Sequence, residues 1–577
     1  MALGRKEEAI VSYARAIELR PNFAEAHAYR GAALHELSRC AEAIASFDRA
    51  IAIRPDYAEV HSNRGVALQQ IGRLEEAVAS YERAIELQPN LAVAHANRGV
   101  VLCKGRQIEA GAASLARALE LNPEYPFLRG TFLHARMQGC DWKGLDGDRS
   151  ALREKVATGA AAVEPLLALG MFDEPELHRR AADLWAGVTC PSDPQLGPIA
   201  PIAAAERIRI GYFSADFREH PVSYLLAGAF EEHDRSRFEI TGFSFGPGKP
   251  DAMTERVAAA MDHFIDVRAQ SDREVALLAR ERHIEIAIDL GGFTHSSRPG
   301  IFALRAAPIQ ASYLGYLGTM GAGWMDYLFA DEVIVPPESR GYYSEKIACL
   351  PSYQANDRKR AISDRAMTRE EFGLPPAGTV FCTFNATYKI APATFDSWMR
   401  ILQRVEGSVL FLLADNAQAA ANLRREAVAR GVAADRLVFA GLLPPAEYIA
   451  RYRVADLFLD TLPYNAGTTA SDALWAGLPV LTLVGRSFAS RVAASLLTAI
   501  GLPELITTSP EDYERVAVEL GTNTGKLGAV RKKLADNRLT TRLFDTTQFT
   551  RDIEAVYEAM CARYRAGLAP DHIVTRS

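Results

Sequence analysis

The chain has 577 residues, of which 49% are hydrophobic and 24% charged, and its formal net charge is −6 at pH 7. These values are typical of a soluble globular protein with several domains. The slightly acidic balance provides no basic surface for a phosphate backbone, so we expect no nucleic-acid partner. No apolar run approaches the length of a membrane span, so we expect no membrane partner. Seven cysteines without metal-like spacing predict reduced thiols in the cytoplasm.

The first quarter of the chain repeats with a period of 34 residues. The period is carried by prolines, glycines, alanines and aromatics, at Pro21, Pro55, Pro89 and Pro123, at Gly31, Gly65 and Gly99, at Ala50, Ala84 and Ala118, and at Phe47 and Tyr81. Each unit has the pattern of two amphipathic helices that bury their apolar faces only against a neighbouring unit. This spacing resembles the tetratricopeptide repeat, and residues 4–20 match the second half of a further unit. We expect an α-helical tetratricopeptide superhelix with its C-terminal cap over residues 1–140, then a helical transition over 141–205.

From Arg207 onward, short β-branched runs alternate with helical segments. The predicted strands are RIRIGYFSAD, FEITGFSF, HFIDV, IEIAIDLGG, IQASYLGY and YLFADEVIV, followed by TVFCTFNA, SVLFLLAD, RLVFAGL, DLFLD and PVLTLVG. Such alternation indicates parallel strands with crossover helices, and ligands bind beyond the carboxyl ends of such strands. We expect two Rossmann-like lobes that face each other across a cleft. The first would cover residues 206–375, and the second, with a C-terminal helix, residues 376–577.

The strongest local signal for chemistry is the segment DLFLDTLPYNAGTTASDALWAGLPVLTLVG, in which a strand is followed by a loop and a helix. The helix opens near Thr468, where unpaired N–H groups attract an anion, and Gly467 has no side chain to block its approach. Thr468 and Thr469 add hydroxyl donors, and Asp472 would accept a hydrogen bond from a ribose hydroxyl. The alternative is a threonine that caps the helix and an aspartate that balances its dipole.

Two further candidates follow predicted strands. Lys389 stands where an ammonium group would neutralise a departing diphosphate, with a solvated surface lysine as the alternative. His220 lies in the loop SADFREHPVSYL, where it would take a proton from a hydroxyl or position that hydroxyl, with Asp216 orienting its ring. A capping or packing histidine is the alternative at that position.

The order and wording of these segments resemble the O-GlcNAc transferase family, which includes SPINDLY-type protein O-fucosyltransferases as close relatives. The resemblance is carried by GYFSADFREHPVSYL, ALRAAPIQASYLGYLGTMGAGWMDY, YSEK, FNATYKI, GTTASDALWAGLPV and SFASRVAASLL, and it covers nearly the whole chain. It implies a glycosyltransferase of GT-B fold, with two Rossmann-like domains behind a tetratricopeptide superhelix. It also implies inverting transfer of N-acetylglucosamine from UDP-GlcNAc to Ser or Thr hydroxyls of acceptor proteins bound in the tetratricopeptide groove, without a metal or other cofactor.

The resemblance also assigns roles to individual residues. It implies that His220, Lys389 and Asp216 are catalytic. The implied contacts with the donor nucleotide are Lys389, Leu443, Tyr448, Arg451, Gly467, Thr468, Thr469 and Asp472. The implied sugar pocket consists of Pro221, Phe293, Thr294 and Leu314. The inner face of the repeats would bind an extended peptide through Asn63 and Asn97, with Tyr29 at the same position of the first unit.

The chain departs from the animal members of this family around the nucleotide. Ala386 replaces a glutamine, Pro445 and Tyr448 replace a lysine and a histidine, and Gly467 replaces a histidine, although Tyr448 would still stack on a base. A protein O-fucosyltransferase that uses GDP-fucose therefore stays an alternative, and a non-catalytic tetratricopeptide scaffold is another. The short connection between the lobes is similar to that of bacterial members.

Overall fold

The computed structural model describes residues 2–37, 39–200 and 206–574, and the chain forms two compact units, Met1–Asp148 and Arg149–Ser577. Each unit has buried apolar clusters of its own. The division falls inside the helix α9 (Leu145–Ala157), a few residues beyond the end of the expected repeat array. Among the described residues, no helix is both long and apolar enough to span a membrane.

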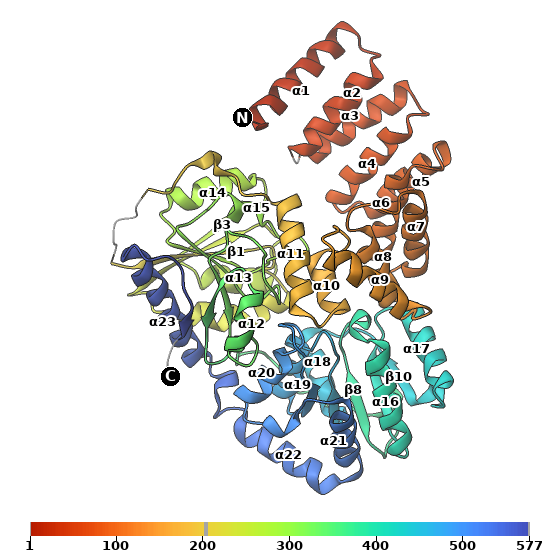
Figure 1. The fold of residues 1–577 in the computed structure, drawn as a ribbon, viewed down its shortest axis with the longest axis vertical. Coiled ribbons are helices and arrows are strands. Elements are labelled where there is room, and N and C mark those ends of the chain that lie inside the picture. Colours follow the sequence, from red (N-terminus) through yellow and green to blue (C-terminus); the bar gives the residue numbers. More distant parts are fainter. Residues whose placement is uncertain (1, 38, 201–205, 575–577) are drawn as a thin grey trace. The chain divides into compact units, whose positions relative to one another are not determined.

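The first unit is built from helix pairs (Figure 1). These are α2 (Ala24–Glu36) with α3 (Cys40–Ile53), α4 (Ala58–Gln70) with α5 (Leu74–Leu87), and α6 (Ala92–Lys104) with α7 (Ile108–Leu121), preceded by α1 (Ala2–Leu19) and followed by α8 (Leu128–Gln138). The repeated glycines allow the helices of a pair to touch, because a Cβ at Gly65 would lie only 2.6 Å from the ring of Tyr81. Gly31 with Phe47 and Gly99 with Leu115 make the equivalent contacts. The predicted tetratricopeptide architecture is confirmed.

A histidine closes the turn before the first helix of each pair. Nε2 of His27, His61 and His95 lies 3.1, 3.1 and 3.0 Å from the carbonyl oxygen of the proline six residues earlier. His178 makes the same contact, at 3.0 Å, with the carbonyl oxygen of Phe172. This one contact of the repeat therefore recurs in the second unit, after the 34-residue period of the sequence has ended.

The second unit begins with a helical segment that contacts loops of both lobes. It contains the end of α9, α10 (Pro165–Met171) and α11 (Pro175–Thr189). The carbonyl oxygen of Cys190, just after α11, accepts a hydrogen bond of 3.2 Å from the indole N–H of Trp324. The carboxylate of Asp173 accepts from the backbone N–H groups of Arg486 and Ser487. The expected helical transition thus joins the two lobes.

Within the part of the chain that the structure describes, the first sheet has eight strands that all pair in parallel. The strands are β1 (Ile208–Ser214), β2 (Phe238–Ser244), β3 (His263–Asp266), β4 (Ile286–Asp289), β5 (Ile309–Ser312), β6 (Tyr327–Ala330), β7 (Lys346–Cys349) and β14 (Ile573–Val574). Their order is β14-β7-β6-β5-β4-β1-β2-β3. The associated helices are α12 (Pro221–Glu232), α13 (Ala252–Ala259), α14 (Asp272–Glu281), α15 (Gly300–Ala303) and α23 (Thr546–Arg565).

The second sheet has six parallel strands in the order β10-β9-β8-β11-β12-β13. They are β8 (Val380–Thr383), β9 (Val409–Leu413), β10 (Leu437–Ala440), β11 (Leu457–Leu459), β12 (Val480–Leu483) and β13 (Ile506–Thr507). The helices of this lobe are α16 (Pro392–Arg404), α17 (Ala417–Ala429), α18 (Pro445–Ala450), α19 (Thr468–Ala476), α20 (Val492–Ala499), α21 (Pro510–Thr522) and α22 (Thr524–Asn537). Both sheets have the strand order of a Rossmann fold, so the predicted pair of Rossmann-like lobes is confirmed.

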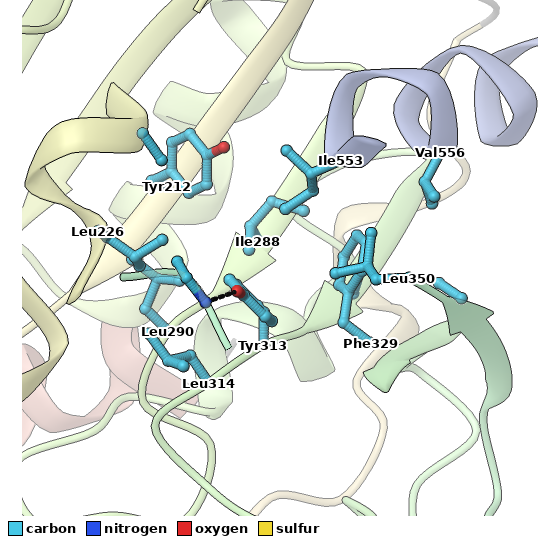
Figure 2. Close-up of a cluster of buried hydrophobic side chains, with 14 of the residues drawn as sticks. Tyr212, Leu226, Ile288, Leu290, Tyr313, Leu314, Phe329, Leu350, Ile553 and Val556 are labelled. Atoms are coloured by element: carbon cyan, nitrogen blue, oxygen red, sulfur yellow. Dashed lines mark hydrogen bonds between the residues drawn. The ribbon is translucent and has the colours of Figure 1, made fainter. Parts of the chain in front are cut away.

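The C-terminal helix packs on the first lobe, although the sequence analysis placed it with the second. The hydroxyls of Tyr557 on α23 and Tyr212 on β1 are 2.8 Å apart, and Glu554 lies 2.9 Å from Nδ1 of His233. Figure 2 shows Ile553 and Val556 of α23 beside the core of this lobe. The sequence pattern of an amphipathic helix shows that one face is apolar. It does not specify which of the two sheets that face packs against.

Candidate functional site

The predicted site residues follow the strands beside the point where each strand order reverses. In the first sheet this point lies between β1 and β4, which lead to His220 and Phe293 respectively. In the second sheet it lies between β8 and β11, which lead to Lys389 and Thr468. Open parallel sheets bind ligands in the crevice outside the carboxyl ends of their strands at such reversals. The fold therefore directs both sets of residues to the position where it favours a ligand.

His220 is the N-cap of α12. Its Nδ1 accepts a hydrogen bond of 3.3 Å from the backbone N–H of Val222 and lies 3.6 Å from a carboxylate oxygen of Asp216. Burial lowers the pKa of His220, and the Asp216 carboxylate opposes part of that change. Because Nδ1 is an acceptor, the neutral ring carries its proton on Nε2. His220 therefore caps the helix, which was the alternative interpretation of this residue. Capping occupies only Nδ1, so Nε2 takes no part in it.

Lys389 ends a short 3₁₀ turn, Thr387–Lys389, that follows β8. Its ammonium group donates a hydrogen bond of 3.1 Å to the carbonyl oxygen of Asn465 and lies 3.7 Å from the ring centroid of Tyr464. Burial lowers the pKa of Lys389 to about 8, and the carboxylate of Asp460 partly opposes this shift. A half-buried ammonium group held in this way differs from the solvated surface lysine that was the alternative.

The helix α19 begins at Thr468, and its N-cap residue, Gly467, provides no side-chain cap. The hydroxyl of Thr469 donates a hydrogen bond of 2.6 Å to the side-chain oxygen of Asn385, so this threonine does not cap the helix. A Cβ at Gly467 would meet nothing closer than 3.5 Å, at Gln354. Packing therefore does not require glycine there, and the open space matches the predicted approach of an anion to the helix N-terminus.

Arg451 and Tyr448 form the centre of the predicted nucleoside contact. Arg451 is fully buried, and its guanidinium carbon lies 3.9 Å from the ring centroid of Phe384 and 4.8 Å from that of Tyr448. Its Nη1 donates a hydrogen bond of 2.6 Å to the carbonyl oxygen of Gly441, close in sequence to the half-buried Leu443. Its buried Nε and Nη2 have no hydrogen-bond partner among the described residues. Both atoms are also closed to solvent, so Tyr448, which is half-buried, is the member of this pair that a ligand can reach, and Arg451 supports its ring.

Asp472, the predicted ribose contact, lies in the first turns of α19 and is ion-paired with Arg360. Burial raises the pKa of Asp472, and the Arg360 guanidinium opposes that rise. The side chains are 5% and 12% exposed, so the pair is well shielded from water. The aspartate therefore already has one partner, which the sequence analysis did not identify.

The four residues implied for the sugar pocket have different environments. Phe293 is buried, 5.4 Å from Tyr316 in an edge-to-face contact, and both belong to a buried cluster that also contains Tyr464 of the second lobe. The Thr294 hydroxyl donates to the backbone of its own loop, at the carbonyl oxygen of Gly291. Leu314 belongs to a different buried cluster (Figure 2). Pro221 is exposed at the first position of α12.

The predicted peptide-binding residues lie in the first unit. Asn63 on α4 is exposed, and Asn97 on α6 is half-buried. Tyr29, at the equivalent position of α2, is 55% exposed and lies 5.8 Å from Tyr13, measured between ring centroids.

The structure adds functional candidates that the sequence analysis did not single out. Asp460 and Tyr464 lie within the motif already identified, but only packing shows that both face Lys389. Asn385, which receives the Thr469 hydroxyl, follows β8. Arg360 stands in the charged stretch NDRKR, where no pattern distinguishes it from its neighbours. Within the described ranges, no group of three or more His, Cys, Asp or Glu side chains is arranged to hold a metal ion.

Comparison with known proteins gives consistent matches. The family description "Glycosyl transferase family 41" matches residues 198–363 and 357–553, and a tetratricopeptide repeat matches residues 58–91. A probable UDP-N-acetylglucosamine–peptide N-acetylglucosaminyltransferase, SEC, of Arabidopsis thaliana is 36% identical over 420 residues, which are 72% of this chain and 43% of the relative. The corresponding transferase of Caenorhabditis elegans is 29% identical over 64% of this chain and 42% of its own length.

A solved structure resembles nearly the whole chain. It is a mutant of the Thermobaculum terrenum O-GlcNAc transferase, with 30% sequence identity and a TM-score of 0.68, and the match covers 93% of this chain and 97% of that one. By contrast, the chain spans less than half the length of the two curated relatives described above.

Proposed function

The chain belongs to glycosyl transferase family 41, and we propose that it transfers N-acetylglucosamine from UDP-GlcNAc to serine or threonine hydroxyls of proteins, with inversion at the anomeric carbon. The names of the plant and nematode relatives and of the bacterial structure support this activity. The observation that carries it is the arrangement at the strand reversal of the second sheet. There, the Lys389 ammonium group and the uncapped N-terminus of α19 provide positive charge beside the buried aromatic site of Arg451.

In the proposed reaction, the acceptor hydroxyl attacks the anomeric carbon while the diphosphate leaves toward Lys389 and the N-terminus of α19. Stabilisation of the charge that develops on a leaving group usually lowers the barrier of such reactions more than any other single effect. Since a lysine and a helix terminus supply that stabilisation, we propose that no metal ion is required. Tyr448 would stack on the base, and the buried Arg451 would hold the Tyr448 ring in place.

His220 would act as a hydrogen-bond donor in this scheme. Its Nδ1 is occupied by the backbone N–H of Val222, so the neutral ring presents a donor, not an acceptor, at Nε2. A donor at that atom would orient a sugar or phosphate oxygen, while the Asp216 carboxylate, 3.6 Å from Nδ1, would stabilise the ring in its protonated form. This favours positioning by His220 over removal of the acceptor proton at Nε2.

The acceptor would bind as an extended segment to the first unit. Asn63 and Asn97 offer side-chain amides at the same place on successive repeats, and amides pair with both groups of a peptide backbone. We also propose a cytoplasmic location, which is supported by seven cysteines that are all free thiols.

The test is transfer of labelled N-acetylglucosamine from UDP-GlcNAc to a protein acceptor, with and without EDTA. We expect transfer by the wild type in both conditions, and a loss of about 10²–10³-fold in Lys389→Met, the range for removal of one charge-stabilising group. Lys532→Met is the matched control, because Lys532 is 76% exposed and pairs with Asp536 on its own helix. Labelling from GDP-fucose alone would establish the fucosyltransferase alternative. If the protein showed neither transfer nor a thermal shift with any nucleotide, the non-catalytic scaffold would be the remaining alternative.

A further inference from the structure

Arg360 lies between two helices that begin at the proposed active site. It belongs to the stretch that connects the first lobe to the second, and its side chain is only 12% exposed. On one side its guanidinium forms the ion pair with Asp472 of α19. On the other side it lies 5.2 Å from the ring centroid of Tyr224, on α12. A single side chain therefore bridges the helix that follows His220 and the helix that starts at Thr468.

Further contacts fix both ends of this bridge. The backbone carbonyl of Arg360 accepts a hydrogen bond of 3.1 Å from the indole N–H of Trp475, one turn after Asp472 on α19. The hydroxyl of Tyr224 donates a hydrogen bond of 2.5 Å to Glu219, the residue directly before His220. The backbone N–H of Glu219 is held in turn by the carboxylate of Asp251, at 2.8 Å. The connected groups thus run from the His220 loop to the predicted ribose contact.

We infer that Arg360 is a positioning residue for ribose recognition, which holds the Asp472 carboxylate in place and ties that recognition to the His220 loop through Tyr224. This inference rests on the proposed function. A buried carboxylate needs a cationic partner to stay ionised, and an ionised carboxylate is the stronger acceptor for a ribose hydroxyl. The guanidinium also restricts the rotation of the carboxylate, so an oxygen stays directed at one hydroxyl position. Arg360 itself would not touch the donor.

The decisive experiment compares the affinity of UDP with that of 2′-deoxy-UDP and 3′-deoxy-UDP by calorimetric titration. The wild type is expected to prefer UDP over one of the deoxy forms by about tenfold, since a hydrogen bond to a charged acceptor contributes about that factor. In Arg360→Met the preference for UDP over that deoxy form should fall well below tenfold, as it should in Asp472→Asn, because the remaining acceptor is uncharged. Arg360→Lys, which keeps the charge without the planar group, should restore part of the preference.

Two matched controls separate this role from a general effect on folding. Lys359→Met changes the neighbouring residue, which is 58% exposed and paired with Glu231, and should keep the full preference for UDP. Tyr224→Phe keeps the ring beside Arg360 and should therefore also keep the preference for UDP. Tyr224→Leu removes the ring and should reduce that preference. These Tyr224 variants leave the Arg360–Asp472 ion pair in place, so they test the bridge even if Arg360→Met does not fold.

The outcomes distinguish the inference from the function on which it rests. An unchanged preference for UDP in both Arg360→Met and Tyr224→Leu would overturn the inference and leave the transferase proposal standing. A wild type that binds UDP but does not distinguish it from either deoxy form would also overturn the inference alone. A wild type that binds none of the three nucleotides would overturn both.

Discussion

The charge of Lys389 lowers the stability of the ligand-free fold, although the proposed function requires that charge for binding the diphosphate. Its ammonium group is half-buried, and burial lowers the pKa of Lys389 from 10.5 to about 8. The unfolded chain therefore holds this proton more tightly than the folded chain does. It follows that Lys389 makes stability rise with pH between about 8 and 10.5, and that its charge disfavours the ligand-free fold below that range.

We therefore predict that Lys389→Met stabilises the ligand-free protein. The expected gain is about 0.5–2 kcal/mol in the free energy of unfolding, the range typical of functional residues replaced for stability. The same substitution should abolish the rise in melting temperature that UDP causes in the wild type. Calorimetry of the protein with and without UDP at pH 7 measures both effects. A lower melting temperature for the ligand-free variant would contradict this account.

The pH dependence of the proposed transfer should show the same group. Because the pKa of Lys389 is about 8, kcat/KM for UDP-GlcNAc should fall about tenfold per pH unit above that value as the ammonium loses its proton. Lys389→Arg keeps its charge over this range, so its residual activity should show no fall below about pH 10. A profile of wild-type kcat/KM that stays flat to pH 10 would rule out Lys389 as the group responsible.

At the scale of the helix, the repeat depends on glycine where two helices cross. A Cβ at Gly65 would lie 2.6 Å from the ring of Tyr81, which is fully buried. We predict that Gly65→Ala lowers the stability of the first unit by about 1–3 kcal/mol, the usual cost of overpacking. Calorimetry of the full chain should place the loss in the transition of the first unit, with the second unit unaffected.

The matched control is Gly105→Ala, just after α6 in the same unit. A Cβ there would meet no atom closer than 3.5 Å, an ordinary van der Waals distance. Its effect should stay within about 0.5 kcal/mol. Equal losses from the two substitutions would show that the crossing contact is not the reason for the glycine.

At the scale of the strand, the reversal of strand order in each sheet places two of that sheet's site loops side by side. Asp216 and His220 follow β1, and Lys389 follows β8, and each of these strands is the first of its lobe. In the order found for both sheets, the first strand lies in the middle, beside the fourth. The loop after the first strand and the loop after the fourth therefore open at the same crevice of their own sheet, so each sheet contributes residues from two separate motifs.

At the scale of the whole molecule, the proposal requires the repeat unit to contribute to acceptor binding. We predict that the double variant Asn63→Ala, Asn97→Ala raises KM for a protein acceptor about tenfold, because two amide contacts of about 0.5–1.5 kcal/mol each are lost. Hydrolysis of UDP-GlcNAc in the absence of acceptor should not change, because that reaction needs only the second unit. Steady-state kinetics with both reactions measures the two effects.

The control for this prediction is Asn90→Ala, in an exposed turn of the same unit. It should leave both rates unchanged. If the double variant slowed UDP-GlcNAc hydrolysis as much as protein transfer, the asparagines would act on the fold and not on the acceptor.

Much of the architecture follows from the sequence alone. The 34-residue period predicted the repeats, and the alternation of strands and helices predicted two parallel sheets, which the structure confirms. The family followed from motifs such as GTTASDALWAGLPV, and the comparisons confirm it. The roles of the individual site residues stay predictions, although the structure places Lys389, Thr469 and Arg451 around one end of the second sheet. Periods and motifs are properties of contiguous residues, so they can be seen without coordinates.

Only the tertiary structure decided which residues far apart in the chain contact each other. Arg360 and Asp472 are separated by 112 positions and Tyr212 and Tyr557 by 345, yet each pair is in direct contact. Likewise, no local pattern shows that α23 covers the first sheet, or that Nδ1 of His220 is an acceptor. Such partners are selected by the shape and burial of the whole fold, because a buried charge or hydroxyl is stable only where some other segment supplies its complement.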